Sequence, residues 1–380
     1  MTTVFNVRNF GAVGDGYHDD RPAIQKAVDC ALQANGAVYF PPGMYLVKAE
    51  IYFPSASANI SIFGDGANAS TIYAQDCGGF NFHFAQNGAQ QPWGVTIRNL
   101  GLRALGVCGT AIRISYGTPP VTNDHSQPSL TLSNLQIVSD PEGHWCDGID
   151  IEGAWNPTLE NCFVSGDSCG GKWNDMHGAG VNLRGMCVNA HLSNVRMNFW
   201  AVGLQVHSTD NRNTEGIYCV NCSMVAVKRG VWIKGDPLVV SAPRISTFTW
   251  IGGLIECRVG KVLDGSAAFH LEHVWTALIA GCQMITETIS DNFENTYAVT
   301  LNECNGVVVC GCDMNAWIFG LATAGACRAI SSKGNTFTNV GVQTVFGWGT
   351  VASRSYGHTL VNNAPNEQDP SMMNKMGFVN

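Results

Sequence analysis

The stretch Thr96-Ile97-Arg98-Asn99-Leu100-Gly101-Leu102 is the first of eight short phrases that keep their apolar residues in the same positions. In each phrase a β-rich segment is interrupted by Asn or Gly and then resumes. The other seven phrases begin at Thr131, Thr158, His191, Tyr218, Thr249, Leu278 and Val308. Their spacing of about 27 to 35 residues is typical of a repeat architecture. Asn or Gly between two β-rich segments predicts a strand, a tight bend and a second strand.

A second repeated segment lies between these phrases and alternates apolar with polar residues. Examples are Gly148-Ile149-Asp150-Ile151-Glu152, Gly180-Val181-Asn182-Leu183-Arg184 and Gly203-Leu204-Gln205-Val206-His207. Such alternation predicts a strand with one buried face. One turn of the repeat cannot bury its own apolar face, so successive turns must stack. We therefore predict an all-β protein, a single-stranded parallel β-helix, which the rule for parallel crossovers makes right-handed.

The residues at and after the bend are expected to be structural. Asn at a fixed bend can bond to the Asn of the next turn and so form a ladder. The next position holds Leu, Val or Cys, and its Cys members are Cys162, Cys222, Cys282 and Cys312. Free Cys packs as a small hydrophobe, so we predict buried free thiols, as in a reducing compartment. The repeat accounts for two of Cys304, Cys310 and Cys312, so we predict no metal site and no cofactor.

The N-terminal segment is expected to cap the stack, because an open strand edge needs cover. Asp20 can begin a helix with Pro22 in its first turn, and Asn35-Gly36 can end it. One face of this capping helix is apolar, with Ile24, Ala27, Val28, Ala31 and Leu32. The predicted parts of the single structural domain are a cap over residues 1–60, a β-helix body over 61–345 and a C-terminal cover or arm over 346–380.

Composition disfavours several kinds of partner. Only 13% of the 380 residues are charged and the net charge is −8, against about 25% charged residues in an average soluble protein. With no basic run, nucleic acid is not an expected partner. No apolar run is long enough to span a membrane, so we expect no membrane insertion. The N-terminus also lacks the basic and apolar regions of a secretory signal.

The N-terminal motifs resemble those of a known family. They are Phe5-Asn6-Val7-Arg8-Asn9-Phe10-Gly11-Ala12-Val13-Gly14-Asp15-Gly16, Asp19-Asp20, Gly36-Ala37-Val38-Tyr39-Phe40-Pro41-Pro42-Gly43 and Phe63-Gly64-Asp65-Gly66. This signature is similar to that of the pectate-lyase-like β-helix superfamily, in the branch shared by phage tailspikes and polygalacturonase-related proteins. The coil pattern extends the resemblance to about residue 340. The resemblance implies a polysaccharide partner, a homotrimer, and a virion or extracellular location.

Stacking in register would gather outward residues of the alternating strand into two columns. The first holds Arg113, Asp150, Asn182, Gln205, Trp232, His270 and Thr300; the second holds Ser115, Glu152, Arg184, His207, Lys234, Glu272 and Asn302. An aromatic ring among polar groups suits a sugar, whose C–H face stacks and whose hydroxyls need donors and acceptors. The predicted substrate-binding residues are Arg184, His207, Trp232, Lys234, His270 and Glu272. A solvated face with chance ion pairs is the alternative.

Two segments resemble the active-site segments of polygalacturonases. Asp147-Gly148-Ile149-Asp150-Ile151 is similar to their Asn-Thr-Asp-Gly-Ile-Asp-Ile, and Asp147 holds the place of the Asp that serves in acid–base chemistry. Gly230-Val231-Trp232-Ile233-Lys234 resembles their Arg-Ile-Lys substrate-binding segment, with Trp232 at the Arg position. Asp175 and His177 precede the strand of the adjacent turn. The predicted catalytic residues are Asp147, Asp150, Glu152, Asp175 and His177.

Hydrolysis of a glycosidic bond needs two carboxylates. Asp150 and Glu152 are two residues apart on a strand, about 6.5–7 Å, which is near the lower bound for an inverting pair. Asp147 or Asp150 facing Asp175 on the adjacent turn is the other arrangement. The first choice is therefore an endo-acting glycoside hydrolase of the tailspike depolymerase type.

Two other functions stay open. A uronate-specific lyase needs a base and a cation that neutralises the uronate carboxylate, and His207 between Arg184 and Lys234 would serve. No column gathers several carboxylates, which disfavours a calcium-dependent pectate lyase. A non-catalytic adhesin would use the same face only to hold a glycan.

Overall fold

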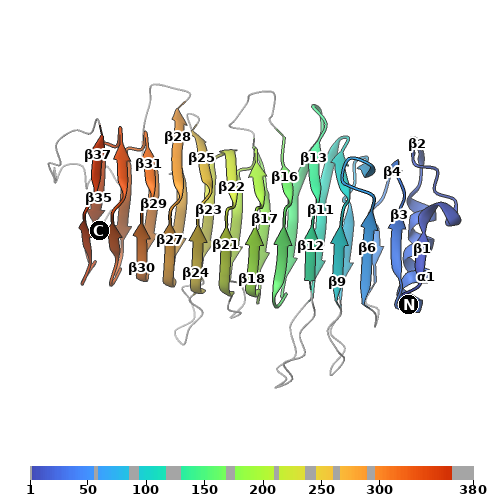
Figure 1. The fold of residues 1–380 in the computed structure, drawn as a ribbon, viewed down its shortest axis with the longest axis horizontal. Helices are drawn as coiled ribbons and strands as arrows, with labels where there is room; N and C mark the ends of the chain where they lie inside the picture. Colours follow the sequence, from blue (N-terminus) through green and yellow to red (C-terminus); the bar gives the residue numbers. More distant parts are fainter. Residues whose placement is uncertain are drawn as a thin grey trace, which may run out of the picture.

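The structure is a computed structural model that describes residues 2–54, 59–84, 94–116, 130–167, 176–208, 214–235, 245–259, 266–288 and 296–361. Within these ranges the chain forms three long parallel sheets, the helix α1 (Arg21–Ala34) and the short 3-10 helix η1 (Val7–Phe10). Figure 1 shows the coils stacked along one axis, with α1 at the N-terminal end. The fold is a right-handed parallel β-helix, as the sequence predicted.

Each coil contributes to sheets that we name A, B and C. Sheet A contains β1 (Val4–Asn6), β3 (Ala37–Phe40), β6 (Ile60–Gly64), β9 (Val95–Arg98), β12 (Leu130–Ser133), β15 (Pro157–Glu160), β18 (Val188–Ser193), β21 (Glu215–Val220), β24 (Ile245–Ile251), β27 (Val274–Ala280), β30 (Asn305–Cys310), β33 (Ser331–Lys333) and β36 (Arg354–Tyr356). Sheet B contains β2 (Asp15–Asp19), β4 (Gly43–Val47), β7 (Ser70–Ala74), β10 (Gly101–Ala104), β13 (Gln136–Ser139), β16 (Phe163–Ser165), β19 (Arg196–Asn198), β22 (Ser223–Val227), β25 (Leu254–Val259), β28 (Gln283–Thr288), β31 (Asp313–Asn315), β34 (Thr336–Thr338) and β37 (Thr359–Val361).

Sheet C contains the alternating strands. They are β5 (Ile51–Phe53), β8 (Phe80–His83), β11 (Val107–Ser115), β14 (His144–Glu152), β17 (Ala179–Arg184), β20 (Val202–His207), β23 (Arg229–Lys234), β26 (Ala267–Glu272), β29 (Tyr297–Asn302), β32 (Phe319–Ala324) and β35 (Val342–Phe346). Each strand pairs in parallel with the corresponding strand of the neighbouring coil. Residues one coil apart in the chain therefore become neighbours in space.

Sheets A and B meet at the bend of each repeated phrase. The Asn residues there have φ between 52° and 57° and are Asn99, Asn134, Asn161, Asn194 and Asn221. Gly281 and Gly311 hold the same place with φ of 62° and 61°. This left-handed conformation favours Gly and, among other residues, Asn. The Nδ2 atoms of Asn134 and Asn194 donate to the Oδ1 atoms of Asn99 and Asn161 at 3.1 and 3.2 Å, so the predicted ladder is confirmed at these two steps.

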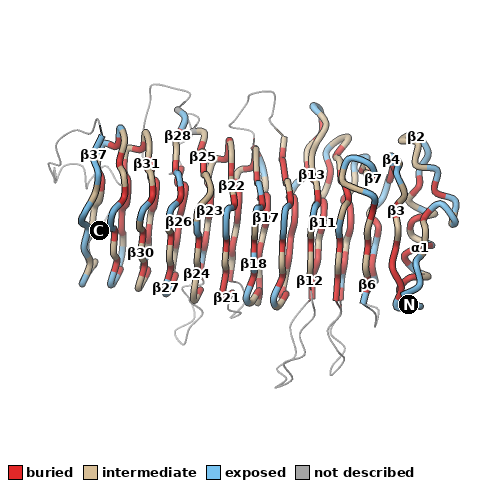
Figure 2. Tube along the Cα trace, in the orientation of Figure 1, coloured by how far each residue is buried: buried red, intermediate tan, exposed pale blue. Residues whose placement is uncertain are grey.

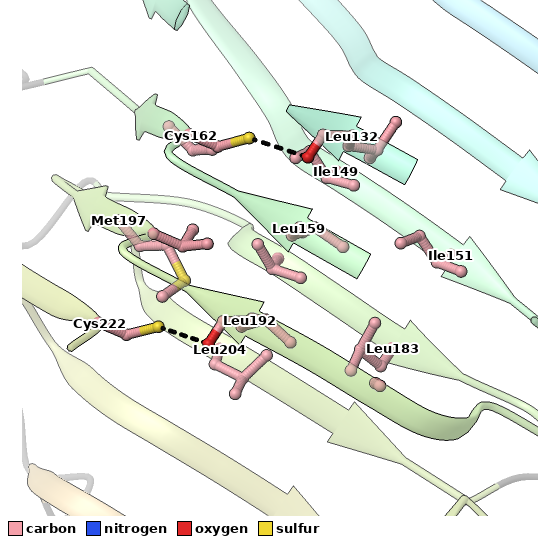
Figure 3. Close-up of a cluster of buried hydrophobic side chains, with 14 of the residues drawn as sticks. Leu132, Ile149, Ile151, Leu159, Cys162, Leu183, Leu192, Met197, Leu204 and Cys222 are labelled. Carbon is pink, nitrogen blue, oxygen red and sulfur yellow. Dashed lines mark hydrogen bonds between the residues drawn. The ribbon is translucent and has the colours of Figure 1, made fainter. Parts of the chain in front are cut away.

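The interior of the coil is apolar and contains the predicted thiol column. Figure 2 shows buried residues along all the coils, and Figure 3 shows Leu132, Leu159 and Leu192 packed together with the corner cysteines. The Sγ atoms of Cys162 and Cys222 lie 3.6 and 3.5 Å from the carbonyl oxygens of Leu132 and Leu192. Cys162, Cys222, Cys282 and Cys312 are all buried free thiols, which confirms that prediction.

The N-terminal helix caps the first coils largely as predicted. All five residues of its predicted apolar face are buried, and Asn35 ends it with φ of 48°. Asp20 lies at the N-cap, but its side chain does not cap the helix. Its carboxylate accepts hydrogen bonds from the N–H groups of Val13 and Gly14 at 2.6 and 2.9 Å instead. With φ of −81° and ψ of −8°, Asp20 has the conformation of a helical residue rather than the extended one of a capping residue.

The stack continues past residue 345 within the described residues. Strands β36 and β37 extend sheets A and B to Val361. The proposed division into cap, body and C-terminal cover stays a prediction.

Candidate functional site

The outward side chains of sheet C form the two columns that the sequence predicted. Parallel pairing aligns Asp150 with Asn182, Gln205, Trp232 and His270. The same register aligns the second column, which runs through Ser115, Glu152, Arg184, His207, Lys234 and Glu272. Four neighbouring coils, those of β17, β20, β23 and β26, thus bring together all the predicted substrate-binding residues on one wall.

Arg184 binds both carboxylates of β14. Its Nε and Nη2 atoms donate to the two carboxylate oxygens of Asp150 at 2.8 and 3.0 Å. Its Nη1 atom lies 3.0 Å from Oε2 of Glu152, which also accepts a hydrogen bond from Ser115 at 2.9 Å. Asp150 and Glu152 raise the pKa of Arg184, mainly through the hydrogen bonds to Asp150. The guanidinium of Arg184 therefore binds the carboxylates of Asp150 and Glu152 at the same time.

Asp150 is also held from its other sides. Its side chain is only 5% exposed, Nδ2 of Asn182 donates to it at 3.1 Å, and Nε of Arg113 lies 3.4 Å away. These donors bind both carboxylate oxygens and fix the orientation of the Asp150 side chain. This arrangement suits an anchor for Arg184.

Asp147 lies on the same strand and has different surroundings. Its Oδ1 accepts a hydrogen bond from the backbone N–H of Ala179 at 2.8 Å. Burial raises the pKa of Asp147, the Ala179 N–H lowers it, and the carboxylate of Asp150 raises it again; the net direction is upward. A carboxyl group with a raised pKa holds its proton to a higher pH, as a general acid requires.

The exposed His177 lies beside the strand of Asp147. Its ring centroid is 5.8 Å from that of His144, the first residue of β14. The next residue, Gly178, has φ of +57°, and a Cβ there would lie 1.6 Å from the carbonyl oxygen of Cys146. Only Gly can make this close approach, which brings Gly178, the residue after His177, against Cys146 and Asp147. Asp175, the remaining predicted catalytic residue, lies outside the described residues.

Aromatic rings continue the wall beyond Arg184. The ring of Trp232 meets those of His207 and His270 nearly perpendicularly, at centroid distances of 5.5 and 6.3 Å. Burial lowers the pKa of His207, and Lys234 lowers it further. Nδ1 of His207 lies 3.3 Å from Nε2 of Gln205, and its Nε2 is buried with no hydrogen-bond partner among the described residues. His207 is therefore neutral at pH 7 but poorly exposed to a substrate.

Glu272 ends the wall in a hydrogen bond to a histidine. Nε2 of His270 lies 2.7 Å from Oε1 of Glu272. This bond lowers the pKa of Glu272, so the carboxylate is ionised at neutral pH. Lys234, exposed in the same column, adds a positive charge.

The sequence did not point to Arg229. Its guanidinium carbon lies 4.6 Å from the ring centroid of Trp232, a cation–π distance. Arg229 precedes Gly230, whereas both columns contain only residues that follow the Gly of each alternating segment. Its spacing of three residues from Trp232 matches that of Asp147 from Asp150, and this is the signal that could have found it.

Among the described residues, no three His, Cys, Asp or Glu side chains are grouped so that they could hold a metal ion. None of the described helices is long and apolar enough to cross a membrane.

With this fold and wall in view, comparison with known proteins gives the family. The chain belongs to the rhamnogalacturonase A/epimerase, pectate lyase-like family, whose model matches residues 4–231. This match spans the whole of the wall up to β23, including Asp147, Arg184 and His207.

Of two curated relatives, one is named as a binding protein and the other as an enzyme. Plasmin and fibronectin-binding protein A of Streptococcus pneumoniae is 41% identical over 183 residues, covering 44% of this chain and 24% of that protein. A polygalacturonase of Juniperus ashei is 28% identical over 169 residues, covering 40% of this chain and 33% of that protein. The chain matches about a quarter to a third of the length of these relatives.

Solved structures share the fold at low identity. The A-module of mannuronan C-5 epimerase AlgE4 from Azotobacter vinelandii has a TM-score of 0.62 at 17% identity, with 97% of this chain and 98% of that chain covered. The catalytic unit of an α-1,3-glucanase from Streptomyces thermodiastaticus has a TM-score of 0.62 at 14% identity, covering 98% and 71%. An N-terminal fragment of bacteriophage phi29 gene product 12 has a TM-score of 0.55 at 18% identity, covering 94% and 66%. The relatives and neighbours thus include carbohydrate-active enzymes and a phage protein.

Proposed function

We propose that the outward face of sheet C binds a polysaccharide and cleaves it as a glycoside hydrolase, with Asp147 as the general acid. The observation that carries this proposal is the upward pKa of Asp147 beside a wall of aligned polar and aromatic side chains. A protonated carboxyl group can donate to the glycosidic oxygen as the bond breaks. The similarity to a polygalacturonase supports the same reaction class.

The second catalytic group is proposed on the adjacent coil. Hydrolysis needs a carboxylate that acts as base or nucleophile across the scissile bond. Asp175 precedes β17 in the chain, only three residues before the close contact of Gly178 with Cys146. His177, exposed beside the Asp147 strand, is proposed to contact the substrate or orient the attacking water.

The remaining wall residues are proposed to bind sugar. Trp232 and His270 supply ring edges, and Lys234 and Glu272 supply one charge of each sign. Arg184 is available on its outer side, since its side chain is 34% exposed. Asp150 and Glu152 are proposed to position Arg184 rather than to transfer protons, because both already bind its guanidinium.

The experiment measures products from a panel of bacterial capsule and plant polysaccharides. Wild-type protein is expected to create reducing ends without an ultraviolet-absorbing unsaturated sugar. Asp147→Asn and Asp175→Asn should each lower the rate by about a hundredfold or more while glycan binding persists. Glu287→Gln on sheet B, which removes an exposed carboxylate far along the stack, is the matched control and should cleave normally. Normal cleavage by Asp147→Asn would refute the assignment of the acid.

A non-catalytic glycan-binding protein is the second candidate. It is favoured by Arg184, which binds Asp150 and Glu152, two of the three carboxylates of β14, and by the 41% identity to a binding protein. This candidate predicts retained glycan binding with no product of any kind.

Lyase chemistry is less well supported by the contacts. The proposed base, His207, is neutral, but its Nε2 is buried and its Nδ1 faces the amide of Gln205. An unsaturated product would nevertheless establish the lyase. Depolymerase activity at a phage tail is the specific biological form that we propose, in keeping with the phage neighbour of the same fold.

A further inference from the structure

The outward face of sheet A changes character along the stack. Over β12, β15 and β18 the outward residues are Thr, Ser, Glu and His. Near the bend, from β21 to β30, they are Tyr218, Val220, Thr249, Ile251, Leu278, Ala280, Val308 and Cys310, whereas the first half of the same strands carries Glu215, Ser246, Trp275 and Asn305. Ile251 and Val220 are 44% and 40% exposed, and Trp275 on the same sheet is 40% exposed. A continuous apolar strip on an outer surface marks an interaction site.

One charge lies at each end of this strip. The register of sheet A aligns a single column, which is Glu160, Ser193, Val220, Ile251, Ala280, Cys310 and Lys333. Glu160 and Lys333 are both exposed, and neither has an ion-pair partner among the described residues. Ile251 lies three coils from each of them. Glu160 and Lys333 are therefore equally far from Ile251, on opposite sides of it, and carry opposite charges.

We propose that a second copy of this chain packs on the strip in antiparallel orientation, with the two-fold axis at Ile251. This symmetry sets Glu160 opposite Lys333 of the second copy, and does so twice in each dimer. It also sets apolar Val220 opposite Ala280. A parallel arrangement in the same register would instead set Glu160 against Glu160, and like charges oppose association. The order of charges thus selects the antiparallel dimer.

The face of sheet A that carries the strip is large enough for a weak, specific interface. Six coil steps of about 4.8 Å give a length of about 29 Å, and central strands of six or seven residues give a width of about 20 Å. Each copy would cover about 600 Å², or about 1,200 Å² in total, at the lower end of specific interfaces. For an interface of this size we expect a weak dimer, with a dissociation constant on the order of micromolar. Sheet C takes no part, so both glycan walls stay open.

The first experiment measures association by sedimentation velocity up to about 100 µM. Wild-type protein should form a dimer. Ile251→Lys places two like charges at the axis and should raise the dissociation constant by more than about tenfold. Ile285→Lys makes the same change on the outward side of sheet B and should leave the dimer intact. A wild-type monomer over this range, a dimer that Ile251→Lys does not weaken, or the homotrimer that the family resemblance implies would each overturn the proposal.

The second experiment exchanges the charges. Glu160→Lys and Lys333→Glu should each weaken the dimer by about threefold or more, because each creates two like-charge contacts. The double variant Glu160→Lys with Lys333→Glu should restore it to within about threefold of wild type. Both positions are exposed, so folding is preserved in each variant and circular dichroism verifies it. Failure of the double variant to recover would rule out the antiparallel register even if a dimer forms.

Discussion

Arg184 and Asp150, on neighbouring coils of sheet C, are joined by two hydrogen bonds of 2.8 and 3.0 Å from the guanidinium to the carboxylate. The side chain of Asp150 is almost fully buried, whereas that of Arg184 is about one third exposed. The pair thus links two coils and directs one side of Arg184 toward solvent. Loss of the cation leaves a buried charge with weaker partners.

Replacement of Arg184 by Leu should therefore destabilise the protein. Asp150 would keep only Arg113 and Asn182, and we expect the free energy of unfolding to fall by about 2–3 kcal/mol. Thermal and denaturant unfolding measure this loss. The double variant Arg184→Leu with Asp150→Asn removes the buried charge as well and should recover part of it. If the single and the double variant lose the same free energy of unfolding, Arg184 and Asp150 are not energetically coupled.

Asp147 should oppose folding at neutral pH. Its folded pKa is raised above that of the unfolded chain, so its contribution to stability is best at low pH and is lost as the pH rises through the folded pKa. Asp147→Asn should therefore gain stability relative to wild type between about pH 4 and pH 7, with little difference below about pH 4. The free energy of unfolding of both proteins, measured across this pH range, tests whether Asp147→Asn is the more stable one. A gain that grows on acidification would contradict the raised pKa.

Glu272 should have the opposite pH dependence. The hydrogen bond to His270 lowers its folded pKa, so its stabilising contribution is present above the unfolded value and is lost as the pH falls through the folded one. Glu272→Gln should cost about 1–2 kcal/mol at pH 7. The difference from wild type should disappear in acid, and unfolding at pH 7 and below pH 4 gives both values.

The Asn at each bend should be replaceable by Gly more easily than by Ala. Asn161 has φ of 52°, and its Oδ1 accepts the ladder hydrogen bond from Asn194. Asn161→Gly loses the hydrogen bond, but Gly adopts the same positive φ without strain, so the free energy of unfolding should fall by about 1 kcal/mol. Asn161→Ala adds about 1 kcal/mol of backbone strain. Thermal unfolding of both variants tests the order, and an Ala variant more stable than the Gly variant would refute it.

The fold could be predicted because its signals are local and repeated. An Asn or Gly bend and an alternating strand recur along the stack, and stacking converts their spacing into the two columns that contain Trp232 and Lys234. The partners of each outward side chain could not be predicted in this way. That Arg184 binds Asp150 and Glu152 together depends on side-chain geometry across coils. The raised pKa of Asp147 likewise depends on burial, and Arg229 approaches Trp232 from outside the alternating pattern.

The bends at Gly281 and Gly311 bound one complete coil, and each coil contacts chiefly the two beside it. Excision of that coil would join Ala280 directly to Gly311, one bend glycine in place of another, and the flanking strands could pair anew without a change of register. Duplication of a coil would likewise leave every strand able to pair with the corresponding strand of the neighbouring coil. Descendants of such a chain can therefore grow or shrink by whole coils, so that the length of the wall changes separately from the side chains that any one coil presents.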